Sequence, residues 1–373
     1  MTEEKYTEEE LTVNEVVEAS ENEATNPVLL SDLNSAPETP ALVIERKDSF
    51  WDRAAKNFDS WKAWIYLLPA LLLLLVFTVW PMINTVRIAF LENYRSIEVA
   101  NENFYELYPE GYSIGLGNFT KVLDFKGFTT CLENTLLLCI ITVPLSTILA
   151  LLIAVCLNAI KPLQRFLQTI FFLPYVTNSI AIGMVFTAMF NVAGTLTSEN
   201  PVIQTAGIMN NILGAFGIEP VNWINGGSSY WANMTVLIVY IVWNALPFKI
   251  LILLGGLQSV NKQYYEAAQI DSTPRWRVFT RITVPLLSPM LAYVIITGFI
   301  GGFKEYSSIV GIFGDKMGPV GDAYRLNTMV GFIYRYLPNS REGWVSAAAL
   351  ILFAIIFAVT MVNLYVSKKK THY

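Results

Sequence analysis

Residues 257–285 read LQSVNKQYYEAAQIDSTPRWRVFTRITVP, a polar and charged stretch between two apolar blocks, 234–256 and 285–301. Its composition predicts two short helices rather than an unstructured connection. Good helix formers fill Tyr264–Ile270, and Glu266 lies near the positive end of that helix dipole. The loop therefore carries its own structure between two membrane-length segments.

The second helix of this loop is expected to follow a break at Asp271–Pro274. Thr273 is a suitable N-cap, and Pro274 suits the first helical position because its missing N–H is not needed there. Side chains at spacings of three then form one apolar face, made by Trp276, Phe279 and Ile282.

The rest of the chain is organised around long apolar blocks. Of its 373 residues 54% are hydrophobic and 15% are charged, whereas soluble domains carry about 25% charged residues. Six blocks approach membrane-spanning length: 64–90, 132–158, 168–190, 234–256, 285–301 and 345–366. We expect an all-α membrane protein with about six transmembrane helices, the fifth kinked or extended at one end by Pro289.

The distribution of Lys and Arg predicts the orientation of these spans. With a cytoplasmic N-terminus, the inner segments 46–62, 159–167, 257–284 and 367–373 hold 14 basic residues in 61 positions. The outer segments 91–131, 191–233 and 302–344 hold 8 in 127 positions. The positive-inside rule therefore predicts that both termini are cytoplasmic. We expect the protein to lie in the plasma or inner membrane of the cell.

Three further segments complete the predicted domain organisation. Residues 1–45 hold twelve acidic residues and one basic residue, and should form a disordered cytoplasmic tail, not a signal peptide. Residues 46–63 should lie on the membrane surface as an amphipathic segment. The first helix and outer loop occupy 64–131, the core membrane domain 132–366, and a short cytoplasmic tail 367–373.

Residues that bind metals or perform catalysis are scarce. The only histidine is His372, and Cys131, Cys139 and Cys156 have no metal-ligand spacing. We therefore expect no metal, no cofactor and no catalytic residue in this chain, and no nucleic-acid partner.

The cytoplasmic loop has two interpretations from local physics. Its arginines (Arg275, Arg277, Arg281) and aromatic face would suit a segment lying flat on anionic lipid. They would equally suit a rigid knob that docks on a cytoplasmic protein and passes force to the helices.

A resemblance to a known family separates these two. Glu266-Ala267-Ala268, followed by Asp271, Phe279, Ile282 and Pro285, resembles the EAA loop of binding-protein-dependent ABC importer permeases. In that family the loop is a coupling helix seated in a cleft of the ATPase subunit. The resemblance implies ATPase-coupling roles for Glu266, Ala267, Ala268, Asp271, Ser272, Arg277, Phe279, Ile282 and Pro285. Ser272 stands where the family usually has glycine, so we expect a turn of somewhat different shape.

The resemblance extends over about residues 64–366. The residues similar to the carbohydrate and glycerol-phosphate group of these permeases are 171–174, 246–248, 255–259, 303–306, 318–319, Leu326 and 343–347. The resemblance implies the type I ABC importer transmembrane fold and alternating access. It also implies three protein partners, which are a second homologous permease, a cytoplasmic ATPase dimer that uses the ATP, and an extracytoplasmic solute-binding protein.

Polar residues inside the fourth block are candidates for the solute path. Asn244 offers a donor and an acceptor to sugar hydroxyls, and Trp243 and Phe248 could stack on a sugar ring. Lys249 should face a partner or a watery path, because a buried lysine is costly otherwise. The structural alternatives are an interhelical hydrogen bond for Asn244 and a structural pairing or snorkelling for Lys249.

Two other functions are alternatives to an importer subunit. An ion-gradient-driven transporter predicts acids within the spans or an inverted repeat, and an intramembrane enzyme predicts paired carboxylates, a metal set or an activated serine. The blocks hold essentially no Asp or Glu and show no repeat, metal set or activated serine. The solute remains open between a carbohydrate, glycerol phosphate and other polyols.

Overall fold

The computed structural model describes residues 62, 64–94, 112–160, 164–196, 201–339 and 341–370. The expected acidic tail 1–45 and, except for Lys62, the surface segment 46–63 lie outside the described residues. The chain divides into the units Met1–Leu72 and Leu73–Tyr373, and the packing below belongs to the second.

Among its described residues, the second unit consists of helices and their connections, with two small hairpins. Its helices up to the loop are the π-turn η2 (Leu75–Val79), α3 (Trp80–Phe90), α5 (Gly117–Leu123), α6 (Lys126–Ala159), α7 (Gln164–Val176), α8 (Ser179–Phe190), α9 (Ile208–Ala215) and α10 (Tyr230–Ser259). From the loop onward they are α11 (Gln263–Ile270), α12 (Arg275–Val278), η4 (Phe279–Thr283), α13 (Val284–Leu286), α14 (Ser288–Phe303), α15 (Ser307–Phe313), α16 (Met329–Tyr336), the 3-10 turn η5 (Leu337–Asn339) and α17 (Glu342–Lys370).

Both hairpins are antiparallel. In one, β1 (Leu91–Glu92) pairs with β2 (Ser113–Ile114). In the other, β3 (Val192–Leu196) pairs with β4 (Pro201–Ala206), with a bulge at Ala193/Gly194.

Within the described residues, four helices are long and apolar enough to cross a membrane: Trp64–Phe90, Lys126–Ala159, Tyr230–Ser259 and Glu342–Lys369. The expected fifth span is bent, because helix Arg275–Leu286 meets Ser288–Phe303 at 68°. Pro289 lies in the first turn of α14, where its missing N–H costs nothing. The predicted kink is therefore confirmed, and it falls at Leu287.

The expected third span, 168–190, is not one helix. It is divided at Thr177–Asn178 into α7 and α8. Asn178 has extended backbone (ψ 123°), and its side chain accepts a hydrogen bond from the Ile180 N–H at 2.8 Å. This N-cap begins a new helix, and α8 alone is about 18 Å long, too short to cross the apolar core of a bilayer.

The long helices α6 and α10 form the spine of the second unit and pack extensively along each other. Their contact near the loop is built on Ala150 and Ala154 against Ile250 and Leu253, all nearly inaccessible to solvent. Small residues on one helix let the two backbones approach closely. Both helices carry an internal proline, Pro144 in α6 and Pro247 in α10.

The loop between α10 and α14 forms the two helices expected, with two corrections. Ser272 has φ +51°, the left-handed conformation that glycine adopts cheaply, so the expectation of a differently shaped turn is wrong. The Thr273 N–H donates to the Ala268 carbonyl at 2.9 Å and the Ser272 N–H to that of Gln269 at 3.0 Å, which closes a Schellman motif on α11. Thr273 therefore ends the first helix rather than capping the second, and α12 begins after an extended Pro274 with no side-chain cap.

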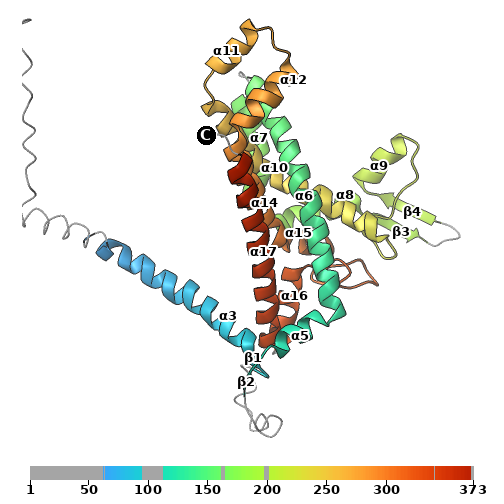
Figure 1. Cartoon of the computed structure of the whole chain (residues 1–373). Coiled ribbons are helices and arrows are strands. Elements are labelled where there is room, and N and C mark those ends of the chain that lie inside the picture. The colour runs from blue at the N-terminus through green and yellow to red at the C-terminus, as the bar shows by residue number, and fades with distance from the viewer. Residues whose placement is uncertain are drawn as a thin grey trace, which may run out of the picture. The chain divides into compact units, whose positions relative to one another are not determined.

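Figure 1 shows where these parts lie within the second unit. The loop helices α11 and α12 project from one end of the long helices, and α5 and α16 lie at the other end of α17. The β3–β4 hairpin and α9 lie beside α8, to one side of the long helices.

Candidate functional site

The loop helices expose large apolar side chains. Ile270 is 84% exposed, Trp276 73% and Tyr264 55%. The rings of Trp276 and Phe279 lie 5.6 Å apart, so the two form one aromatic surface. A clustered apolar surface on a polar loop is typical of an interaction site.

The residues predicted to couple to an ATPase divide by exposure. Glu266, Ala267, Asp271, Ser272 and Arg277 are exposed, and Phe279, Ile282 and Pro285 are half-buried. Ala268 is buried, and its carbonyl accepts the Thr273 N–H that closes the turn after α11. The structure thus places these residues on one small unit, with the polar ones facing outward.

The loop is tied to the two membrane helices that flank it. The Tyr265 hydroxyl lies 3.3 Å from the Thr283 hydroxyl, which joins α11 to η4. Leu287, at the bend before α14, is 1% exposed and packs in the core cluster with Leu253 and Leu257 of α10. A displacement of the loop would therefore be passed to both α10 and α14.

A cavity of about 270 Å³ lies among α6, α7, α10 and α14. Asn244, Phe248 and Lys249 line it, and Tyr175 of α7 stacks on Phe248 at 5.8 Å with ring planes 18° apart. Trp243 does not join them. It packs on Phe186 at 5.4 Å and lines a separate apolar pocket with α7 and α8 residues.

Lys249 is 5% exposed, and its ammonium is held by α6. Its Nζ donates to the Ser146 hydroxyl at 2.7 Å, the Thr147 hydroxyl at 3.0 Å and the Val143 carbonyl at 3.2 Å. An added Cβ at Gly298 would lie 3.2 Å from this Nζ, so glycine keeps α14 close to the cluster. The structural pairing of Lys249 that the sequence left open therefore exists in the fold, and its partners are three neutral oxygen atoms.

Several cavity residues were missed from the sequence. Ser146, Tyr175, Thr297 and Glu305 line the same cavity from α6, α7, α14 and the turn after α14. Segments 171–174 and 303–306 belong to the family resemblance, but a resemblance in sequence does not say which helix a residue faces. Helical period groups Ile241, Asn244, Ala245 and Phe248 on one face of α10, and only the fold supplies the opposite walls.

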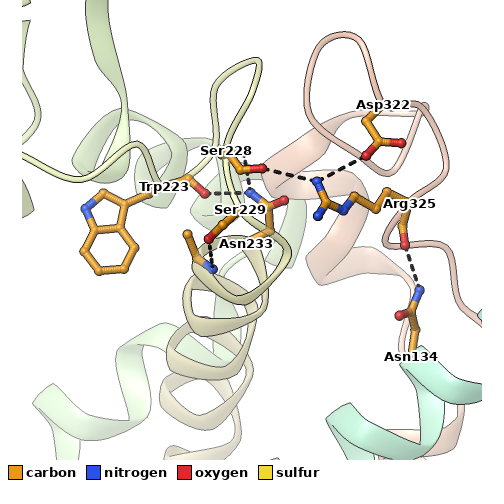
Figure 2. Close-up of polar contacts among 8 residues, drawn as sticks. Asn134, Trp223, Ser228, Ser229, Asn233, Asp322 and Arg325 are labelled. Atoms are coloured by element: carbon orange, nitrogen blue, oxygen red, sulfur yellow. Dashed lines mark hydrogen bonds and ion pairs between the residues drawn. The ribbon is translucent and has the colours of Figure 1, made fainter. Parts of the chain in front are cut away.

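At the end away from the loop, a polar network holds the connecting segments onto α6 and α10 (Figure 2). Asn134 donates to the carbonyls of Arg325 and Asn327 at 3.0 and 2.9 Å and accepts from the Tyr230 hydroxyl at 2.7 Å. Arg325 in turn reaches the Ser228 carbonyl at 3.2 Å and the Asp322 carboxylate at 3.1 Å. Asn134 of α6 is therefore an interhelical tie to Tyr230 of α10.

Comparison with known proteins gives a family match over most of the chain and relatives of similar length. The family profile described as "Binding-protein-dependent transport system inner membrane component" matches residues 143–372. The lactose transport system permease protein LacF of Rhizobium radiobacter is 26% identical over 314 residues, which cover 83% of this chain and 93% of LacF. The arabinooligosaccharides transport system permease protein AraP of Halalkalibacterium halodurans is 30% identical over 278 residues, which cover 74% of this chain and 82% of AraP.

The fold is similar to that of a solved transporter. The crystal structure of a bacterial ABC transporter involved in the import of the acidic polysaccharide alginate contains a chain that matches with a TM-score of 0.66 and 21% identity. The match covers 86% of this chain and all of that one. At this identity the likeness concerns the fold.

Proposed function

Because this chain belongs to the family of inner membrane components of binding-protein-dependent transport systems, we propose that it forms half of the membrane pathway of an ATP-driven carbohydrate importer. It is a multi-pass membrane protein and a transport permease. The observation that carries the mechanism is the exposed α11–α12 unit, which the Tyr265–Thr283 hydroxyl contact braces internally and the packing of Leu287 joins to α10 and α14.

In this mechanism the loop is the site where a separate ATPase acts. Glu266, Asp271 and Arg277 supply polar contacts, and the exposed Trp276 and Ile270 supply apolar area. ATP-driven closure of an ATPase dimer would push this unit, and the buried Leu287 would pass the push to α10 and α14. This chain itself then needs no cofactor and performs no catalysis, because ATP is bound and hydrolysed by the partner.

The partners and the orientation follow from the same proposal. The loop and both termini face the cytoplasm, as the density of basic residues favours. A second, homologous permease completes the pathway, and an extracytoplasmic binding protein delivers the solute. Support for the last partner comes from the alginate transporter, which has also been crystallised in complex with an alginate pentasaccharide-bound periplasmic protein.

A sugar or oligosaccharide is the solute that the cavity and the relatives favour. The relatives are described as permeases for lactose, arabinooligosaccharides and trehalose/maltose. In the cavity, the stacked Tyr175 and Phe248 offer an aromatic face, and Asn244, Thr297 and Glu305 offer donors and acceptors. Sugar rings combine these needs, with apolar faces and hydroxyl edges.

The test joins ATPase association to uptake. Glu266→Ala should lower both co-purification of the ATPase and ATP-driven uptake of labelled oligosaccharide in vesicles. Gln269→Ala changes another exposed polar residue of α11 and should leave both near wild type if the Glu266 carboxylate is specific. Unchanged association and uptake in Glu266→Ala would contradict the coupling role. Uptake in ATP-depleted vesicles under an imposed ion gradient would instead favour a secondary transporter.

A further inference from the structure

A groove of about 510 Å³ lies between α14 and α17, at the end of these helices nearest the loop. One face of α14 forms its wall, through Leu291, Ala292, Ile295 and Ile296, and Val366 of α17 faces them. The 68° bend at Leu287 leads α13 away from α14, so Val284 and Pro285 close one end of the groove. The volume suits a sizeable apolar ligand.

The polar groups of the groove gather at the same end. Lys369 lines it, within the run Lys368–Lys370 that ends α17, and Asn363 lies about two turns before. The Ser288 hydroxyl is buried there without a hydrogen-bond partner among the described residues. Such a group normally finds a partner, so a ligand that reached this hydroxyl on binding would satisfy it.

The lining therefore complements an amphiphilic ligand, with an apolar wall for its tail and polar groups at one end for its headgroup. Its wall is aliphatic, without the aromatic pair found in the interior cavity, and its mouth holds a cation. None of the described residues that line it is acidic. A lysine at the end of a membrane helix extends toward the headgroup region, where anionic lipid attracts it.

From these features we propose that the groove binds an anionic glycerophospholipid. One acyl chain lies along Leu291–Ile296, and the phosphate meets the Lys369 ammonium and the Ser288 hydroxyl. Since α14 also carries the loop at its bend, the lipid occupies the angle through which α12–α13 and α14 would move. This site is separate from the solute cavity and rests only on the chain's spanning a membrane.

Photolabelling of the assembled transporter tests the site. The complex is reconstituted in phosphatidylcholine–phosphatidylglycerol nanodiscs that contain traces of one lipid with a diazirine on its acyl chain. The phosphatidylglycerol probe should label peptides 284–296 and 363–369 several-fold more than the phosphatidylcholine probe does. This comparison uses the wild-type chain, so it does not depend on the folding of any variant.

Variants then separate the contribution of the Lys369 charge to lipid binding from that of the apolar wall. Lys369→Gln should lower the preference for the anionic probe about fivefold, the effect of one basic residue near a charged surface. Ile295→Trp should reduce labelling by both probes, because the indole fills the groove. The matched controls are Lys316→Gln, an exposed lysine between α15 and α16, and Leu152→Trp, an exposed position on α6. Neither control should change the labelling of the groove.

Two results would overturn the proposal. Equal labelling of the groove by the two probes would show an apolar surface without headgroup recognition. A photoreactive residue at position 295 that captures the second permease instead of lipid would show that protein fills the groove.

Discussion

The buried Lys249 makes an asymmetric prediction about stability. Its ammonium donates to two side-chain hydroxyls and one backbone carbonyl of α6, and it is 5% exposed. The double variant Ser146→Ala/Thr147→Ala keeps the charge and removes two of its three acceptors. Hydrogen bonds to a charged group contribute about 1.5–3 kcal/mol each, so the loss should be at least about 3 kcal/mol. Water from the adjoining cavity could restore part of it, which places the expectation at that lower end.

Lys249→Met should behave differently, although it removes all three bonds. The Ser146 hydroxyl already donates to Thr142 or Val143, and the Thr147 hydroxyl donates to Val143 at 2.7 Å, so no donor is left unpaired. Methionine has a similar length and removes the cost of burying a charge. Replacing a buried charge with an apolar residue of similar volume is often neutral or stabilising, so we expect a change within about 1 kcal/mol.

Thermal unfolding of the purified permease in detergent measures both variants. At roughly 2–4 °C for each kcal/mol, the hydroxyl double variant should lower the midpoint by at least about 6 °C, and Lys249→Met should move it by less than about 4 °C. The control is Thr130→Ala/Thr235→Ala, which removes two exposed hydroxyls that bond only to carbonyls of their own helices. A midpoint for Lys249→Met as low as that of the hydroxyl double variant would refute this account of the cluster.

Four further substitutions concern the backbone and the polar network around Asn134. Ser272→Gly should stabilise the loop turn by about 1 kcal/mol, because the left-handed conformation (φ +51°) costs a residue with a Cβ; slower hydrogen exchange of the turn amides measures it. Gly183→Ala should destabilise by about 2 kcal/mol or more, since its Cβ would lie 2.6 Å from the Gly311 Cα and force α8 from α15. Gly255→Ala, with no atom within 4 Å of its Cβ, should instead stabilise by up to about 1 kcal/mol, and the paired melting midpoints decide between clash and propensity. Asn134→Ala leaves two carbonyls and a tyrosine hydroxyl without their buried partner and should cost about 2–4 kcal/mol, so a melting midpoint close to wild type would contradict the role of the network.

Much of the fold was predictable because its signals are local. Long apolar runs marked the four continuous spans, Pro289 indicated a kinked fifth, and helix formers followed by a polar break indicated α11 and α12. The errors were local too. Asn178 divides the third block because a single N-cap can begin a new helix inside an apolar run, and a hydropathy average does not register one capping residue.

The prediction that Thr273 caps the second loop helix was also wrong because of a local capping choice. Thr273 and Pro274 had the composition of a helix start, but the Schellman closure on Ala268 recruits Thr273 to the preceding helix. Two competing caps are available to the same four residues. Only the folded backbone, with Ser272 held left-handed, selects one of them.

The candidate site also divides into features that the local sequence determines and features that tertiary packing determines. Sequence by itself determined that the chain spans a membrane, that residues 257–284 form a structured loop, and that Asn244, Phe248 and Lys249 lie on α10. Only the tertiary structure decided that Lys249 meets Ser146, 103 residues away, that Tyr175 stacks on Phe248, and that Trp243 turns to a different pocket. Helical period states which side chains share a face of one helix. It cannot state which face of another helix lies opposite, because that is set by the packing of whole helices against one another.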